Sequence, residues 1–303
     1  MPNGALSAGD ARAARALSLG FVALTGATFV LIVLGALVRA HGAGLACPDW
    51  PLCFGRVIPP FDLRVGFEWT HRLLAGGVGL AFVALAFGVL RRPAARRRCA
   101  RAVACAALLL VIQIALGALT VWHLLAAWSV TAHLLTGNAF AACLLGIALQ
   151  LRRGAEADPP GPVRGVRPWV VAAGACLGLQ LVLGGLVSSR YAGLACPEWP
   201  TCSAGVWFPS WEGVVGLHLL HRTNGYALGA LLLAAAVATR GAGRAGRVLR
   251  VAAGLGLAQI VVGVLNVRLA LPVEVTGLHS ALAAALVLSL AAASVEAFSG
   301  RRT

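Results

Sequence analysis

Long apolar stretches separated by short polar segments dominate the chain. The first, Phe21–Val38, is an uncharged stretch of 18 residues, long enough to cross a bilayer as a helix and longer than the core of a signal peptide. Seven more apolar stretches follow at roughly 65–90, 99–122, 127–150, 168–188, 213–239, 248–267 and 273–298. The pattern therefore predicts an all-α polytopic membrane protein with eight transmembrane helices, of which the first is retained.

The two halves of the chain repeat each other. The segment Gly35–Cys53 aligns without gaps on Gly184–Cys202, with 12 of 19 positions identical. Further along, His71-Arg72 aligns with His221-Arg222, and Gly117–His133 aligns with Gly263–His279. Because each repeat holds an even number of spans, both copies enter the membrane from the same side. We expect two side-by-side four-helix bundles, residues 1–160 and 161–303, joined by a Pro- and Gly-rich linker at 154–168.

The distribution of charge orients these helices. The chain is 59% hydrophobic and 12% charged, its net charge is +15, and all 25 of its basic residues are arginine. Of these, 18 fall in segments on the same side as the N-terminus, so the positive-inside rule places both termini in the cytoplasm. We expect a multi-pass protein of the cell membrane, the inner membrane of a bacterium. The arginines form short clusters between apolar stretches, which fits anionic lipid headgroups and no nucleic acid partner.

Four of the seven histidines recur in the repeat. His71 pairs with His221 and His133 with His279, each near the outward end of an even-numbered span. Two imidazoles at similar depth in an apolar bundle suit a heme iron, whereas zinc needs three or four ligands. We therefore expect a bis-histidine heme in each half, and the alternative is that these rings bond backbone carbonyls at helix ends. No role is assigned to the other three, His41, His123 and His218.

Charged residues near the outward helix ends are the next candidates. Arg39, Arg72 and Arg222 could bind a carboxylate such as a heme propionate, or extend to lipid phosphates and water. Glu68 lies one turn before His71, where it could transfer protons, stabilise charge on a bound substrate, or simply favour the start of a helix. Because Glu68 aligns with a histidine in the second half, we expect the first half to do chemistry and the second to hold a cofactor.

Cysteines also divide by the repeat. Two pairs recur in the outward loops, each enclosing a Pro-acid-Trp-Pro sequence. Outward loops meet an oxidising compartment, so each pair is expected to form a short disulfide, with unpaired thiols as the alternative. The pairs are Cys47–Cys53 and Cys196–Cys202, and we interpret Cys99, Cys105, Cys143 and Cys176 as packing residues.

Three features together resemble a known family. The Gly-Leu-Ala-Cys-Pro-Asp-Trp-Pro-x-Cys loop, the Glu-x-x-His-Arg motif at 68–72 and the duplicated bundles with four histidines are similar to heme A synthase, over roughly residues 17–298. The resemblance implies oxidation of the C8 methyl group of heme O to a formyl by successive hydroxylations, giving heme A for cytochrome c oxidase. By similarity, His71 and His133 would hold the substrate heme, His221 and His279 a heme b, and Glu68 would be the catalytic carboxylate. The Cys47–Cys53 pair would support heme transfer or electron flow.

The resemblance also implies partners, namely the heme O synthase that supplies the substrate and the assembly factors of cytochrome c oxidase, while self-association is left open. Two other functions would use four histidines: a b-type cytochrome that passes electrons from quinol to an outer acceptor, and a heme carrier. The first gives no reason for an acid in only one half. Carriers usually have helices broken at the midplane, which these apolar stretches do not suggest.

Overall fold

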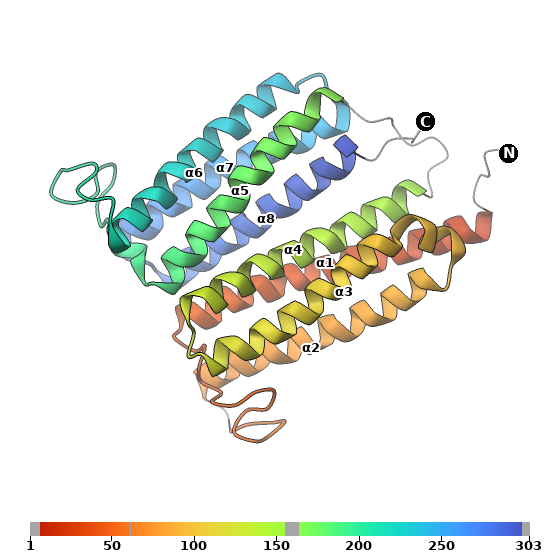
Figure 1. Ribbon diagram of the computed structural model, residues 1–303, viewed down its shortest axis with the longest axis horizontal. Helices are drawn as coiled ribbons and strands as arrows, with labels where there is room; N and C mark the ends of the chain where they lie inside the picture. The colour runs from red at the N-terminus through yellow and green to blue at the C-terminus, as the bar shows by residue number, and fades with distance from the viewer. Residues whose placement is uncertain (1–6, 61, 155–163, 299–303) are drawn as a thin grey trace.

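Two four-helix bundles stand side by side in the computed structural model (Figure 1), which describes residues 7–60, 62–154 and 164–298. The first bundle consists of α1 (Ala8–Ala40), α2 (Leu63–Leu90), α3 (Pro93–Trp122) and α4 (Ala127–Gly154). The second consists of α5 (Arg167–Ser189), α6 (Gly213–Ala238), α7 (Gly243–Arg268) and α8 (Val273–Phe298), with the short 3₁₀ helices η1 (Arg164–Val166) and η2 (Ala192–Leu194) beside α5. The predicted boundary at 160/161 and most of the predicted linker lie outside the described residues.

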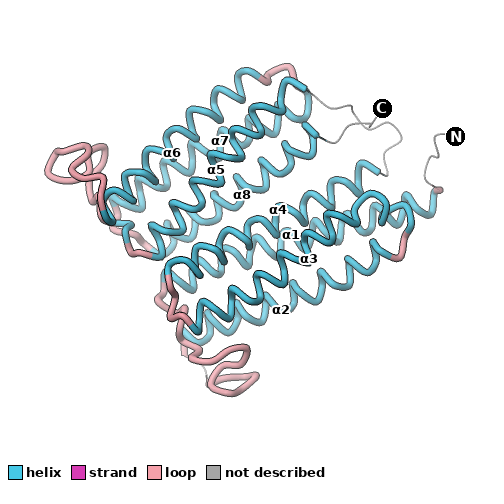
Figure 2. The backbone as a smooth tube through the Cα atoms, in the orientation of Figure 1, coloured by secondary structure: helices cyan, strands magenta, loops and turns pink. Residues whose placement is uncertain are grey.

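The prediction of an all-helical polytopic membrane protein is confirmed, and Figure 2 shows helices and loops throughout the described ranges. Seven of the eight α-helices in these ranges are long and apolar enough to cross a membrane. The eighth, α6, lacks a continuous stretch of that length and apolarity, because its outer half carries His218, His221, Arg222 and Asn224. It has the same length as α7 and α8 and packs between α5 and α7, so it lies among the spans.

Local sequence explains where several helices begin. The carboxylate of Asp62 caps α2 by accepting a hydrogen bond of 2.9 Å from the N–H of Val65. Pro93 occupies the first turn of α3, where a missing N–H costs nothing. As a result α3 starts several residues before the predicted apolar stretch, and its arginine-rich first turns extend beyond the apolar core.

The short outward turns are built alike in both halves. Leu124 and Leu125, between α3 and α4, adopt positive φ angles, as do Ala270 and Leu271 between α7 and α8. In each case the second residue packs on a glycine of the preceding outward loop. A Cβ at Gly44 would lie 3.2 Å from Leu125, and one at Gly193 would lie 2.9 Å from Leu271. The structure therefore repeats at the level of single side-chain contacts.

Each bundle has its own apolar core, and both cores lie toward the arginine-rich end. Phe21, Phe82 and Phe140 belong to the first core, and Leu232, Leu249 and Leu286 to the second. The four repeated histidines lie outside these clusters, each at the same position from the start of its helix as its repeat partner. The inner half of each bundle is thus filled by apolar side chains, which leaves the outer half for function.

The two bundles meet through α1, α4, α5 and α8. Small residues allow close approach at this interface. A Cβ at Gly185 of α5 would lie 2.8 Å from Thr131 of α4, and a Cβ at Gly277 of α8 would lie 3.0 Å from Leu37 of α1. The halves therefore pack directly against each other, helix against helix.

A buried ionic cluster joins the bundles at the arginine-rich end. The carboxylate of Glu296 in α8 forms a short ion pair with Arg153 of α4, and both side chains are buried. Nε of Arg244 in α7 lies 3.4 Å from the other carboxylate oxygen. Because charges out of water need a partner, this cluster makes the end of α8 dependent on α4.

We expect Glu296→Leu to lower the free energy of unfolding by about 3–5 kcal/mol, because Arg153 then loses its buried carboxylate partner. Glu274→Leu is the matched control, since Glu274 is an exposed acid on the same helix, and its effect should stay within about 0.5 kcal/mol. Denaturant unfolding of the detergent-solubilised protein measures both values. Equal effects of the two substitutions would refute the importance of the cluster.

Candidate functional site

Each of the four repeated histidines packs against a glycine of the preceding helix. A Cβ at Gly35 of α1 would lie 3.0 Å from Cε1 of His71, and a Cβ at Gly184 of α5 would lie 3.0 Å from Cε1 of His221. The glycines leave room for the imidazole rings directly on the helix backbone.

The other helix pair in each bundle repeats this contact. The corresponding distance is 3.5 Å for Gly117 and His133, and 3.2 Å for Gly263 and His279. These glycines were not among the predicted site residues, although the repeat alignment already pairs Gly35 with Gly184 and Gly117 with Gly263.

The histidine rings also carry unpartnered polar atoms. Within the described part of the chain, Nδ1 of His71, His133 and His279 is buried without a hydrogen-bond partner. His71 lies near His133, and His221 stands in the same relation to His279. Buried polar atoms without partners are rare. A ring that only bonded a carbonyl would have such a partner, so this alternative does not describe His279, whereas the rings of His71 and His133 also lie near the backbone of Leu31 and Gln113.

The residues present fit a heme better than a bare metal ion. Across the described residues, no group of three or more His, Cys, Asp or Glu side chains could hold a metal ion. Two imidazoles and a glycine-lined cradle in each bundle instead match the axial ligands that a heme requires.

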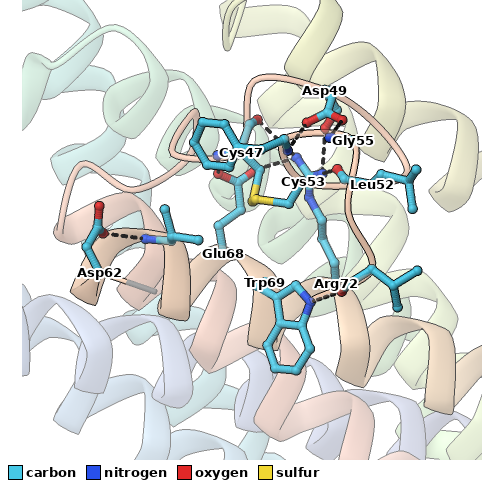
Figure 3. The surroundings of a disulfide bond; sticks show 12 residues. Cys47, Asp49, Leu52, Cys53, Gly55, Asp62, Glu68, Trp69 and Arg72 are labelled. Carbon is cyan, nitrogen blue, oxygen red and sulfur yellow. Dashed lines mark hydrogen bonds and ion pairs between the residues drawn. A yellow bond between two sulfur atoms is a disulfide. The ribbon is translucent and has the colours of Figure 1, made fainter. Parts of the chain in front are cut away.

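Glu68 and Arg72 bind the first outward loop, between α1 and α2 (Figure 3). Glu68 is buried, and its Oε2 accepts a hydrogen bond of 2.8 Å from the N–H of Cys47. Its Oε1 lies 2.6 Å from Nη2 of Arg72. The carboxylate therefore links α2 directly to the loop that the disulfide Cys47–Cys53 closes.

Arg72 binds the same loop through its backbone carbonyls. Its Nη1 donates to the carbonyls of Asp49 and Leu52, both at 2.6 Å, and its Nη2 donates to the carbonyl of Cys47 at 3.3 Å. With the bond to Glu68, both terminal nitrogens are engaged. The partners of this guanidinium are therefore carbonyls of the loop. The sequence had suggested a heme propionate, lipid phosphates or water instead.

In the second half an arginine binds the outward loop in the same way, but no carboxylate takes part. Arg222 donates to the carbonyls of Thr201 at 3.0 Å, Glu198 at 3.0 Å and Cys196 at 3.2 Å. His218 takes the place of Glu68, with Nδ1 2.9 Å from the carbonyl of Ala192 and Nε2 3.5 Å from Arg222. The sequence assigned no role to His218, and the structure places it in the position that Glu68 has in the first half.

An acid inside each disulfide loop holds the following turn. The carboxylate of Asp49 accepts hydrogen bonds from the N–H groups of Phe54 at 2.6 Å and Gly55 at 2.7 Å. The bond from Gly55 holds the pKa of Asp49 below its ordinary value. Glu198 does the same with Ala204 and Gly205, inside the loop closed by Cys196–Cys202. The repeated acid of the loop motif is therefore a turn-forming residue.

Arg39 reaches across to the other half. Its Nε donates to Oγ of Ser188 at 2.8 Å, and its guanidinium lies 5.0 Å from the ring centroid of Tyr191. Ser188 is the residue that aligns with Arg39 in the repeat. Arg39 therefore joins the outward ends of α1 and α5.

The remaining predicted residues have local contacts. Nδ1 of His41 lies 2.9 Å from the carbonyl of Leu37, and the ring stacks on Phe67. His123 packs edge-on against Trp128. Of the cysteines interpreted as packing residues, Cys99 is buried, Cys143 and Cys176 are half-buried, and Cys105 is exposed. Although exposed, the side chain of Cys105 in α3 still contacts that of Cys143 in α4.

Comparisons with known proteins identify the family of this chain. Residues 19–65 and 61–291 match the COX15-CtaA family, described as cytochrome oxidase assembly protein. The heme A synthase of Shewanella oneidensis is 30% identical over 87% of this chain and 91% of its own length. The heme A synthase of Alkalihalophilus pseudofirmus is 34% identical over 67% and 70%. A protoheme IX farnesyltransferase of Haloarcula marismortui is 36% identical over 46% of this chain and 30% of that protein. The chain belongs to the COX15-CtaA family of cytochrome oxidase assembly proteins, the family of the heme A synthases.

Proposed function

We propose that this protein is a heme A synthase, an oxidoreductase that converts the C8 methyl group of heme O to a formyl by successive hydroxylations. Family membership supports the reaction. The observation that carries the assignment is the duplicated cradle, in which paired histidines rest on glycines in both bundles. Of the residues that the structure describes, a buried acid lies near such a pair in the first bundle only.

The first bundle, within residues 1–160, takes the substrate. His71 and His133 hold heme O, and the glycine beneath each ring, which leaves room for it on the helix backbone, supports this role. The second bundle, within residues 161–303, takes a heme b as cofactor between His221 and His279. When bound, that heme supplies one-electron chemistry.

Glu68 is the catalytic carboxylate of this proposal. Among the described residues it is the one buried acid at the outward end, since Glu296, the other buried acid, lies at the opposite end. It precedes His71 by one helical turn, so its charge is close to any group that His71 holds. A fixed carboxylate in a site shielded from water can stabilise positive charge on the substrate or move a proton.

Propionate binding is proposed for Arg39, Arg72 and Arg222. The three lie at the outward end, and Nε of Arg72 and Arg222 makes no hydrogen bond within the described part of the chain. Each Nε–H can therefore donate to a carboxylate while the terminal nitrogens keep the loop in place.

The alternatives explain less of the structure. A b-type cytochrome with two fixed hemes gives no reason for Glu68 in one half and His218 in the other. A heme carrier would be expected to have broken spans, whereas α1 to α8 are continuous over their described lengths.

The proposed setting is the inner membrane of a bacterium, with the arginine-rich end and both termini in the cytoplasm. Heme O synthase would supply the substrate, and the match to a protoheme IX farnesyltransferase supports this link. Assembly factors of cytochrome c oxidase would receive the product, and membrane lipids surround the helices.

The function is tested by expressing the chain with heme O synthase in a host that lacks heme A. We expect extracted hemes to include a formyl-bearing product, identified by mass and absorption. A well-folded protein that yields no hydroxylated or formyl heme would overturn the proposal.

Glu68→Gln should lower product formation by at least about a hundredfold, since the side chain keeps its shape and loses its charge. Heme content should stay near that of the unchanged protein. Glu212→Gln, which changes an exposed acid at the start of α6, is the control and should have no effect. Full activity of Glu68→Gln would remove the residue from the chemistry.

Gly184→Val should reduce the heme bound in the second bundle, because the added side chain enters the space of the His221 ring, 3.0 Å from Cε1 at its Cβ. Gly178→Val is the matched control, since Gly178 lies on the same helix and a Cβ there would meet nothing within 4 Å. Heme content per protein, measured by absorption, distinguishes them. If both variants bind heme equally, the cradle is not required.

A further inference from the structure

Aromatic side chains gather on the outward loop of the second half, between α5 and α6. Trp207, Phe208 and Trp211 are each more than half exposed, and the rings of Phe208 and Trp211 stack with their centroids 5.4 Å apart. The segment 203–211, which carries all three, has no charged residue. An exposed apolar cluster of this kind marks a surface that meets lipid or another protein.

The position of the loop places this cluster beside the membrane. Figure 1 shows the loop projecting to the side of the helix ends, away from the first bundle. Nε1 of Trp199, in the same loop, donates a hydrogen bond of 2.9 Å to the hydroxyl of Tyr226 in α6. Tyr226 shares an exposed helical stripe with Leu233 and Val237. Because α6 lies among the spans, this stripe faces acyl chains, so the loop is held against the lipid-facing side of α6.

The first half has a different contact at this point. Trp50, the counterpart of Trp199 in the repeat, packs edge-on against Trp122 at the end of α3. Gly76 stands where α6 has Tyr226 in the alignment of the repeated histidines. The bond from indole to hydroxyl is therefore particular to the second half.

Aromatic rings suit the boundary between headgroups and acyl chains. Trp and Tyr bury an apolar ring at this depth while their polar N–H or O–H stays bonded, and they are enriched there in membrane proteins. A segment without charged side chains enters that layer without the cost of removing a charge from water. The composition of segment 203–211 and its place at the side of the bundle thus favour lipid as its partner.

We propose that segment 203–211 inserts Trp207, Phe208 and Trp211 into the headgroup layer of the outward leaflet and so anchors the second outward loop to the lipid surface. The bond between Trp199 and Tyr226 holds the start of the loop at the same side of α6. The inference is independent of what the repeated histidines bind, so it can fail or hold separately from the proposed function.

The test uses the full chain in lipid nanodiscs, with its tryptophans replaced by fluorotryptophan and observed by fluorine magnetic resonance. Trp207→Phe and Trp211→Phe each remove one signal and so identify it. Line broadening is measured with a lipid that carries a nitroxide near the start of its acyl chain, and separately with a water-soluble gadolinium chelate. The ratio of the two effects reports whether a ring lies in lipid or in water.

Two surface substitutions supply the references. Val237→Trp places a ring on the lipid-facing stripe of α6, and Ala8→Trp places one at the exposed start of α1, ahead of its apolar stretch. We expect the lipid-to-water ratio at Trp207 and Trp211 to match that of Val237→Trp and to exceed that of Ala8→Trp severalfold. If the ratio at either position is that of Ala8→Trp, the loop faces water and the inference is overturned. If neither agent broadens the two signals, a second copy or another protein covers the cluster, and the inference is equally overturned.

Discussion

The outer ends of both bundles depend on one contact, in which an imidazole ring packs against the backbone of a glycine on the preceding helix. Each histidine of the two pairs lies on a glycine of the preceding helix, and a Cβ at those glycines would stand 3.0 to 3.5 Å from Cε1. Glycine destabilises a helix interior by roughly 1 kcal/mol relative to alanine. The packing of α1 with α2, α3 with α4, α5 with α6 and α7 with α8 compensates for this and sets where each ring lies.

The outward loops follow from the same helices. Arg72 and Arg222 directly follow a candidate ligand and reach up to the carbonyls of a disulfide-closed loop. These two arginines therefore connect each loop directly to its helix, α2 or α6. In the first half Glu68 adds a buried carboxylate to this connection. The proposed acid and the proposed ligand are thus fixed by one helix end.

Much of this arrangement could be predicted from the sequence because it is duplicated. The repeat singled out the four histidines, the two cysteine pairs and the asymmetry of Glu68 without any structure. The partners of Arg72 could not be predicted, because they are backbone carbonyls whose positions depend on the path of the loop. The contact of Gln180 with His221, at 3.2 Å between Nε2 and Nδ1, could not be predicted for a related reason. Gln180 lies 41 residues before His221, and only the packing of α5 on α6 brings the two together.

The two halves differ in the residues that surround the first histidine of each pair. Around the first histidine, the first half has Leu31 and Leu74 where the second half has Gln180 and Asn224. One turn earlier, the first half has Glu68 where the second has His218. Both halves share the same contact of histidine on glycine. If one half takes the substrate and the other a cofactor, as proposed, the difference in function must come from these few substitutions around two similar sites.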